Sequence, residues 1–333
     1  METIIETTQS IEGNLKFDSL FFTFHGVEFC DKRWRNTVKK VISPTKWLPR
    51  ILQEYIVVKV LRAYAYKQNV KVIVCTDEKA CKLAAKARGS KNKPALLSWL
   101  HRSLHTFKHR DYFNLVDAHI AIAKEIATQI NEISNKPTFV INNCVSLSHE
   151  YQFKRIDESP PSFIYVGRIE FEGQKRLRDL ITAFSLVRDN NVHLQIIGDG
   201  ADISQCIKLC EDLHLTQRVH FYGWKRNPWE FCFNNFKNVV ALCLTSSYEG
   251  FPMVLIEAIS QGIFCISSNC STGPKEIINE HNGLLYSEGN ITELSLCMEK
   301  ALKRPHGELY VNDRWSKKEY IKSWEKVIFQ LRL

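Results

Sequence analysis

The second half of the chain alternates short apolar runs with segments of helical hydrophobic spacing. The apolar runs have the length of strands and lie at 162–167, 192–198, 218–223, 239–245 and 264–268. Helical spacing fills the intervals at 174–187, 202–214, 228–236 and 252–261. Strands that are apolar throughout and separated by helices predict a parallel sheet covered on both faces.

Glycine and polar residues collect where these predicted strands end. The stretches after the strands read GRIEFEGQ, GDGAD, GWKRN, SSYEG and SNCSTG. In an open parallel sheet, ligands bind at the carboxyl ends of the strands. The pattern therefore predicts a binding site built from these loops.

The first half of the chain is less regular. Its apolar runs predict strands at 70–75, 93–101, 117–123 and 138–145. A polar stretch with a proline pair at 149–161 predicts a linker, and the final amphipathic segment, 315–331, predicts a helix.

At 333 residues the chain is too long for one ordinary hydrophobic core and has the length of two domains. We predict an α/β protein with two Rossmann-like domains, at 1–148 and 162–310. The last segment, 311–333, is expected to return to the first domain.

The net positive charge of the chain belongs entirely to its first half. Residues 1–150 hold 23 Lys and Arg against 14 Asp and Glu, whereas residues 151–333 hold 22 of each kind. The charge is densest between Lys32 and Arg62, with Trp34 and Trp47 interleaved. An anionic lipid leaflet attracts such a surface by about 1 kcal/mol per basic residue. No nucleic-acid recognition motif accompanies the charge, so nucleic acid is not an expected partner. A solvated basic face without a partner is the alternative.

Other sequence features limit the class of protein. The sequence contains no run of about 18 apolar residues, so it predicts no membrane span. The first residues lack the pattern of a signal peptide. The eleven cysteines include no CxxC pair and several stand singly in apolar runs, which favours buried free thiols in a reducing cytoplasm.

The segment TSSYEGFPMVLIEAISQG (245–262) carries the most specific signal. A buried strand ends at Thr245, a turn follows, and Pro252 is expected as the first helical residue. The amides of Met253 and Val254 would then be unsatisfied donors at the positive end of a helix. Such a helix start binds pyrophosphate without a metal.

Two carboxylates flank this expected phosphate site. Glu249 precedes the helix and Glu257 lies within it, about 7–8 Å along the axis from Pro252 at 1.5 Å per residue. One could hold sugar hydroxyls and the other ribose hydroxyls.

The string EGFPMVLIEA after a buried strand resembles the signature of retaining glycosyltransferase family 4, which has the GT-B fold. The resemblance implies that Glu249 contacts the donor hexose and Glu257 the ribose. YVGRIEFEGQKRLRDL (165–180) resembles the element whose Arg and Lys neutralise the diphosphate, here Arg168 and Lys175. Their spacing is one residue longer than is usual, so Arg176 could replace Lys175. The turn that would line the donor comprises Gly250, Phe251, Pro252, Met253 and Val254.

Several further stretches between residues 160 and 290 are similar to bacterial lipopolysaccharide core α-1,6-galactosyltransferases, which use UDP-galactose. They are FEGQKR, IIGDG, RVHFYGW, EGFPM and SSNCSTGPKEII. The similarity implies that Tyr222, Gly223 and Trp224 line the uracil loop and that Asp199 and Gly200 line the neighbouring loop.

A histidine of the first domain completes the expected site. His101 matches a family histidine near the donor sugar and acceptor. A metal ladder of His101, His105 and His109 on a helix is the alternative, but it lacks a carboxylate partner. We therefore expect neither a metal nor a cofactor.

The expected function is that of a retaining glycosyltransferase that moves a hexose, first of all galactose, from a UDP-sugar to the lipopolysaccharide core. The acceptor is a lipid-linked oligosaccharide, so the expected location is peripheral, on the cytoplasmic face of the inner membrane. The alternatives are a capsular or exopolysaccharide transferase with another donor, a nucleotide-sugar epimerase, and a non-catalytic binding module.

The beginning of the chain departs from the family pattern. Relatives have a strand and a Gly-rich loop before the first helix, and this sequence begins at Met1-Glu2-Thr3, inside that helix. We expect the first domain to lack its first strand, which is central in a doubly wound sheet. The chain as written should then be poorly soluble or inactive, and an N-terminally extended form should restore activity.

Overall fold

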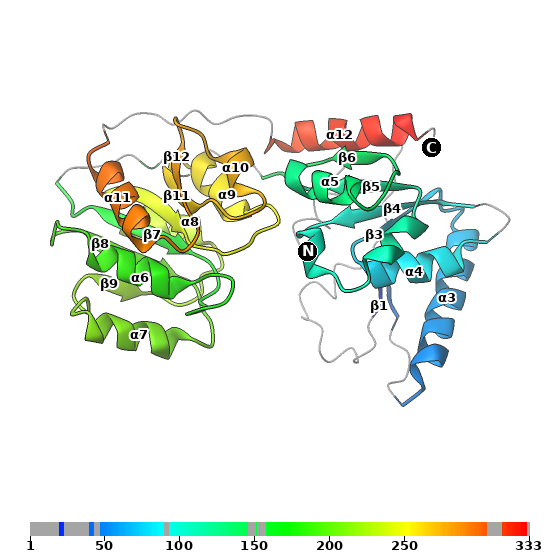
Figure 1. The fold of residues 1–333 in the computed structure, drawn as a ribbon, viewed down its shortest axis with the longest axis horizontal. Helices are drawn as coiled ribbons and strands as arrows, with labels where there is room; N and C mark the ends of the chain where they lie inside the picture. The colour runs from blue at the N-terminus through cyan, green and yellow to red at the C-terminus, as the bar shows by residue number, and fades with distance from the viewer. Residues whose placement is uncertain are drawn as a thin grey trace. The chain divides into compact units, whose positions relative to one another are not determined.

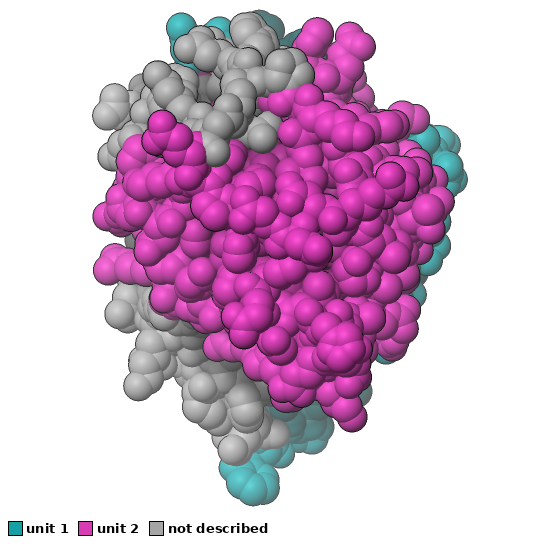
Figure 2. Space-filling view, turned by 90° about the vertical axis from the view of Figure 1, so that its left-hand side faces the viewer, with its two compact units in different colours: residues 1–122, 126–143, 317–333 teal, residues 123–125, 144–316 magenta. Residues whose placement is uncertain are grey.

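The computed structural model describes residues 20–22, 40–42, 47–89, 93–145, 151, 153, 158–304 and 315–331. The chain divides into two compact units (Figure 2). The first contains residues 1–122, 126–143 and 317–333, and the second contains residues 123–125 and 144–316. The expectation that the first domain lacks its first strand concerns the beginning of the chain, and residues 1–19 lie outside the described part. Most of the predicted linker also lies outside the described part of the chain.

The second unit is built on one sheet of six parallel strands (Figure 1). The strands are β7 (Ser162–Val166), β8 (His193–Ile197), β9 (Val219–Phe221), β10 (Val239–Leu244), β11 (Cys265–Ser268) and β12 (Gly283–Tyr286). Their order is β12-β11-β10-β7-β8-β9. The chain thus winds outward in opposite directions from β7 and β10, and a ligand crevice is expected where the winding reverses. The five predicted strands are confirmed, and β12 was not predicted.

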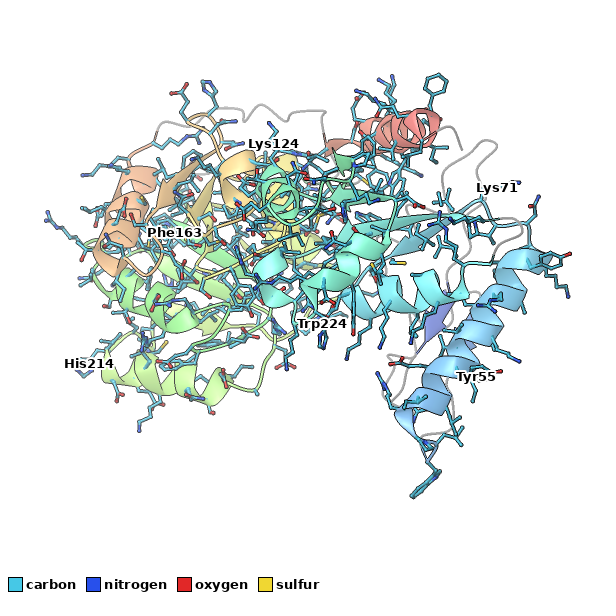
Figure 3. The ribbon with its side chains drawn as sticks, turned by 45° about the vertical axis from the view of Figure 1, so that its right-hand side comes forward. Tyr55, Lys71, Lys124, Phe163, His214 and Trp224 are labelled. Carbon is cyan, nitrogen blue, oxygen red and sulfur yellow. The ribbon has the colours of Figure 1, made fainter. Side chains whose placement is uncertain are left out.

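Five of the described helices connect these strands: α6 (Leu177–Ser185), α7 (Ile203–Asp212), α8 (Pro228–Asn235), α9 (Met253–Ser260) and α10 (Pro274–Ile277). A further helix, α11 (Ile291–Leu302), follows β12. Side chains of α6, α7 and α11 share one hydrophobic core with the sheet. Phe163 lies on the central strand β7 and is labelled in Figure 3. Phe163 and Phe184 of α6 are both fully buried in this core. This core supports the strands whose carboxyl ends carry the loops of the predicted site.

The first unit contains a parallel sheet in the order β3-β4-β5-β6. These strands are β3 (Val72–Cys75), β4 (Ala95–Leu100), β5 (Ala118–Ala121) and β6 (Thr138–Val140), inside the four predicted runs. A separate parallel pair joins β1 (Leu20–Phe22) to β2 (Lys40–Ile42). The helices are α3 (Arg50–Lys67), α4 (Glu78–Ala87), α5 (Lys124–Asn131) and α12 (Lys317–Gln330), with 3-10 turns η2 (Leu104–Thr106) and η3 (Arg110–Leu115).

The last helix, α12, belongs to the first unit. Its Trp324 is 1% exposed and packs edge-on against Trp99 of β4, with ring centroids 5.1 Å apart. Tyr320, one turn earlier, is also buried. The core of the first unit therefore includes residues more than 200 positions apart in the sequence.

The described residues also bear on two expectations about the class of protein. The ten cysteines among them are all buried and free, as the sequence predicted. No helix in the described ranges is both long enough and apolar enough to cross a membrane.

We expect Trp324→Ala to lower the free energy of unfolding of the first unit by about 3–5 kcal/mol, because it leaves a cavity beside Trp99. Phe329→Ala is the control: Phe329 lies on the same helix but is 83% exposed, so its truncation should change stability by less than about 0.5 kcal/mol. Urea titrations of both variants measure the difference. Equal effects would contradict the packing of α12.

Candidate active site

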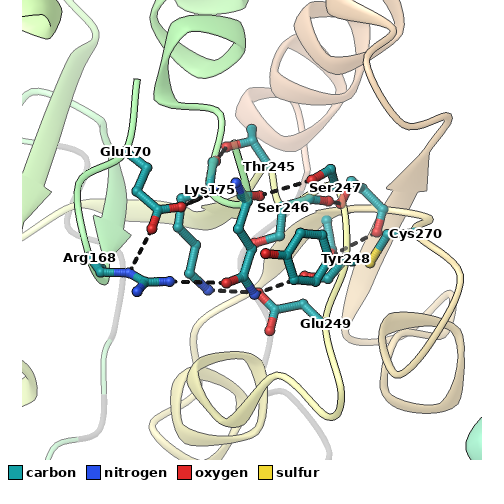
Figure 4. Close-up of polar contacts among 12 residues, drawn as sticks. Arg168, Glu170, Lys175, Thr245, Ser246, Ser247, Tyr248, Glu249 and Cys270 are labelled. Carbon is teal, nitrogen blue, oxygen red and sulfur yellow. Dashed lines mark hydrogen bonds and ion pairs between the residues drawn. The ribbon is translucent and has the colours of Figure 1, made fainter. Parts of the chain in front are cut away.

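The loop after β7 is organised by one carboxylate. Glu170 pairs through Oε1 with Nε of Arg168 at 2.9 Å, and its Oε2 accepts from the amides of Gln174 at 3.1 Å and Lys175 at 3.2 Å (Figure 4). The phenol of Tyr165 donates to the carbonyl of Arg168 at 2.6 Å. Arg168 and Lys175, both predicted as phosphate cations, are thereby fixed in one loop.

Lys175 joins this loop to the one after β10. Its Nζ lies 2.7 Å from Oε1 of Glu249, and the side chains are 17% and 10% exposed, respectively. The carbonyl of Lys175 accepts from the hydroxyl of Thr245 at 2.7 Å, and the carbonyl of Gln174 accepts from the amide of Ser247 at 2.8 Å. The ion pair thus sits at the two strands between which the winding of the sheet reverses.

Arg176, the alternative to Lys175, is engaged elsewhere. Its Nε pairs with the buried carboxylate of Asp179 at 2.6 Å, and this hydrogen bond raises the pKa of the guanidinium. The residue adopts a left-handed conformation (φ 50°) immediately before α6. The geometry therefore favours Lys175 as the cation beside Glu249.

The start of α9 differs by one residue from the prediction. Pro252 is the N-cap (φ −72°, ψ 96°) and Met253 is the first helical residue. The prediction that Pro252 is the first helical residue was wrong, because its ψ is extended rather than helical.

Most of α9 is buried. Leu255, Ile256 and residues 258–260 have no significant exposure, whereas Met253, Val254 and Glu257 are half-buried. Met253 and Val254 lie at the start of the helix, where backbone amides lack intrahelical acceptors and the dipole is positive. The accessible first turn of α9 is thus suited to bind an anion.

The turn before α9 is supported by the loop after β11. The hydroxyl of Thr272 donates to the carbonyl of Glu249. Gly273 has φ +92°, and a Cβ at this position would lie 2.6 Å from Cδ of Pro252 and 3.0 Å from the carbonyl oxygen of Gly250. Phe251, in the same turn, is buried. Only glycine fits this contact without moving the turn.

Glu257 is held by an indole. Its Oε2 accepts from Nε1 of Trp229 on α8 at 3.1 Å. Burial raises the pKa of the Glu257 carboxyl above its usual range, and the indole hydrogen bond opposes that rise. The carboxylate is therefore oriented at a cost in desolvation.

The loops after β8 and β9 are packed tightly against their neighbours. A Cβ on Gly200 would overlap the carbonyl of Ile169, and the amide of Gly198 donates to the carbonyl of Gly223 at 3.1 Å. Asp199, the other predicted contact in this loop, is exposed and accepts from the amide of Gly200 at 2.8 Å. These loops therefore offer mainly backbone groups.

The aromatic residues after β9 differ in role. The hydroxyl of Tyr222 donates to Oε1 of Gln195 at 2.9 Å, and its ring packs 5.2 Å from that of Phe231. Its side chain is therefore committed to packing. Trp224 is 55% exposed, so its ring is accessible.

His101 lies in the first unit, directly after β4. Its ring centroid is 4.4 Å from that of Trp99, and its Nε2 is buried without a hydrogen-bond partner. Burial lowers the pKa of His101 to about 4, so the imidazole is neutral near pH 7 and could accept or donate a hydrogen bond.

The metal ladder is not supported in the described part of the chain. His105 lies in the 3-10 turn η2 and does not share a helix with His101. The described residues contain no group of three or more His, Cys, Asp or Glu placed to hold a metal ion.

Sequence reasoning missed the residues that position the predicted ones. Glu170 orients Arg168, Trp229 orients Glu257, and Thr272 and Gly273 support the turn before α9. Glu170 lies inside the GRIEFEGQ stretch that predicted Arg168, but nothing in that pattern says which acid turns toward the cation.

Two α/β units with parallel sheets, the second with a helix start at the reversal of its sheet, have the architecture of the GT-B class of glycosyltransferases. The family model "Glycosyl transferases group 1" matches residues 149–321. The chain belongs to this family and is a glycosyltransferase.

Two similar proteins have the same name. The chain is 34% identical to the lipopolysaccharide 1,6-galactosyltransferase of Escherichia coli K12, over 93% of this chain and 87% of the relative. It is 35% identical to the enzyme of the same name from Salmonella typhimurium LT2, over 88% and 82% of the two chains.

Solved structures support the same fold. The apo form of the lipopolysaccharide outer core galactosyltransferase WaaB superimposes with a TM-score of 0.85 at 32% identity, over 99% of this chain and 95% of that one. Anabaena Alr3699/HepE in complex with UDP-glucose, at 17% identity, has a TM-score of 0.73 over 99% and 95%. At that identity the second likeness concerns the fold alone.

We expect Gly273→Ala to displace the turn before α9, because the left-handed backbone and the contact with Pro252 both oppose a Cβ. Stability should fall by about 1–3 kcal/mol. Binding of UDP, the donor nucleotide expected from the sequence, should weaken at temperatures where the variant is folded. Ser271→Ala, at an exposed position of the same loop, should change neither quantity. Calorimetric titration with UDP and a thermal melt test this, and unchanged UDP affinity in folded Gly273→Ala would contradict it.

We expect Glu257→Gln to increase the free energy of unfolding near neutral pH, because it removes a buried charge. Binding of UDP, the expected donor nucleotide, should weaken by about tenfold, since charge-assisted hydrogen bonds exceed neutral ones by roughly 1 kcal/mol or more. The raised pKa of folded Glu257 means that its contribution to stability is fully present below the ordinary value of 4.5 and is lost as the pH rises through the folded value. The gain should therefore vanish in acid.

Denaturation curves across pH measure this difference. Glu325→Gln, at an exposed position of α12, should follow the native protein at every pH. A stability gain for Glu257→Gln that persists below pH 4.5 would contradict the assignment to the Glu257 carboxyl.

Proposed function

We propose that this glycosyltransferase moves a hexose, with galactose as the first candidate, from a UDP-sugar to the lipopolysaccharide core oligosaccharide. The observation that carries the proposal is the Lys175–Glu249 pair at the sheet reversal. The two lipopolysaccharide 1,6-galactosyltransferases, matched over most of their length, support the choice of sugar and acceptor.

The donor diphosphate would bind at the start of α9. The amides of Met253 and Val254 supply donors there, and Arg168 and Lys175 supply positive charge. A phosphate near Lys175 competes with Glu249 for the ammonium, which would free the Glu249 carboxylate for sugar hydroxyls. Glu257, oriented by Trp229, would accept from the ribose.

The uracil would lie along the loops after β8 and β9, between Asp199–Gly200 and Tyr222–Trp224. Because the Tyr222 side chain packs inward, the base would be read by backbone groups and by Trp224. The Gly200 and Gly223 positions keep side chains out of that path.

Transfer breaks the bond between the anomeric carbon and the UDP oxygen and forms a bond from that carbon to the acceptor oxygen. We propose that both events occur on one face of the sugar, through an oxocarbenium-like state, with the leaving phosphate taking the acceptor proton. Charge that develops on UDP is stabilised by Arg168, Lys175 and the α9 amides, which were oriented before the reaction. These groups would make a metal unnecessary.

The first unit would supply the acceptor side. His101, neutral because its pKa is low, is our candidate for a contact with the donor sugar and acceptor. The net positive charge of the first half favours an anionic membrane surface, so we propose a peripheral enzyme at the cytoplasmic face of the inner membrane.

The test is a panel of UDP-sugars with isolated core oligosaccharides as acceptors. We expect UDP-galactose to give the highest kcat/KM and NMR of the product to show an α-linkage. A β-linkage would overturn retention, transfer from another sugar would overturn galactose, and an epimerised sugar released without acceptor would identify an epimerase.

In this assay we expect Glu249→Gln to reduce kcat by at least about a hundredfold, the effect of removing one preorganised electrostatic contact. Glu211→Gln, which changes an exposed carboxylate on α7, is the control and should retain native activity. Native kcat in Glu249→Gln would exclude a role for the carboxylate in transfer.

A further inference from the structure

Helix α3 carries apolar residues on two opposite faces. Its buried side is formed by Gln53, Val57 and Leu61. The positions on the opposite side follow one another at intervals of three or four residues, which places them in one stripe along the helix. This outward stripe consists of Ile51, Tyr55, Lys59, Arg62 and Tyr66.

The apolar members of the stripe are strongly exposed. Ile51 is 81% exposed, Tyr55 55% and Tyr66 69%, and the adjoining Leu52 and Trp47 are 47% and 86% exposed. Tyr55 is marked on α3 in Figure 3. Single exposed apolar residues need no explanation, but a contiguous group of them marks an interaction surface.

Cations alternate with these apolar side chains. Residues 47–71 contain five basic residues, and Glu54 is their single acid. Glu54 is neutralised by Lys82 and Lys86 of α4, at 3.3 and 3.6 Å. The ammonium of Lys59 lies 5.0 Å from the centre of the Tyr55 ring, so aromatic and cationic groups meet within the stripe.

The C-terminal half of the stripe continues into a cavity of about 610 Å³. Lys59, Arg62, Tyr66 and Arg88 are among its lining residues. Arg62 is anchored there by the carbonyls of Ala87 and Lys86, at 3.1 and 2.7 Å. The positive charge beside the stripe is therefore fixed in place by the fold.

We propose that this outward stripe of α3, with Trp47, is the surface through which the first unit docks on an anionic lipid bilayer. Tyr and Trp prefer the interface between water and lipid, aliphatic side chains enter the acyl region, and cations attract anionic headgroups. The charge pattern selects the occupant, because a cationic rim around an apolar strip complements headgroups above acyl chains. The inference rests on the proposed function, in which the acceptor is lipid-linked.

The test is sedimentation of the full chain with vesicles of phosphatidylcholine, with and without phosphatidylglycerol. We expect binding only when phosphatidylglycerol is present, and weaker binding at higher salt. The double variant Ile51→Ser/Tyr55→Ser should bind at least about tenfold more weakly, since it removes two membrane-inserting side chains. Lys59→Glu/Lys67→Glu reverses the charge of the stripe lysine and of the exposed lysine that ends α3. This variant, counted with the stripe variants below, should bind as weakly.

Matched controls lie in the second unit. Ile207→Ser/Leu296→Ser removes two other exposed apolar residues, and Lys208→Glu/Lys303→Glu reverses two other exposed lysines. Both should bind vesicles like the native chain. Equal loss in controls and stripe variants would overturn the assignment to α3, as would native binding by the stripe variants.

Two further measurements separate this inference from the proposed function. With a delipidated core oligosaccharide in solution the stripe variants should retain native kcat/KM, whereas with acceptor embedded in vesicles they should lose about tenfold. Vesicle binding without any sugar transfer would defeat the proposed function and leave the docking surface standing. A native dimer that Ile51→Ser/Tyr55→Ser converts to monomer would show that the stripe binds a second copy and would overturn the inference.

Discussion

The ion pair between Lys175 and Glu249 is the interaction on which the candidate site depends. It connects the loops after β7 and β10, the two central strands of the second unit, across the point where the sheet reverses. Removing one partner from such a half-buried pair leaves an uncompensated charge. The pair therefore joins the two loops. It also places a carboxylate and an ammonium where a ligand can replace either partner of the ion pair.

The supporting contacts are arranged around that pair in a consistent way. Glu170 orients one cation, Trp229 orients the second carboxylate, and Gly273 allows the loop after β11 to approach the turn before α9. Glu170 and Trp229 each contact a charged group, and Gly273 supports the backbone of the turn. The site is thus preorganised by its second layer of contacts, a requirement for electrostatic stabilisation of a leaving group.

Much of the second unit could be predicted from the sequence, because its strands are apolar throughout and their ends are marked by glycine. The first unit was harder. Helix α3 was missed because apolar residues occur on both of its faces, so its pattern shows no single buried side. The one-residue error at Pro252 has another cause. The spacing indicates where a helix starts, but the ψ of the proline decides whether that residue belongs to the helix or precedes it. Orientation of side chains such as Glu170 depends on tertiary contacts that no local pattern contains.

The position of α12 has a consequence for the order in which the protein can form. Trp324 belongs to a unit whose other residues, apart from the end of the chain at 317–333, all precede position 144. During synthesis the nascent chain exposes Trp99 long before its partner emerges from the ribosome, and residues 144–316 are made in the interval. The second unit, which is nearly continuous in sequence, can therefore reach its native state while the first is still incomplete. A chain that terminates before α12 would have one complete unit and one unit without its last helix.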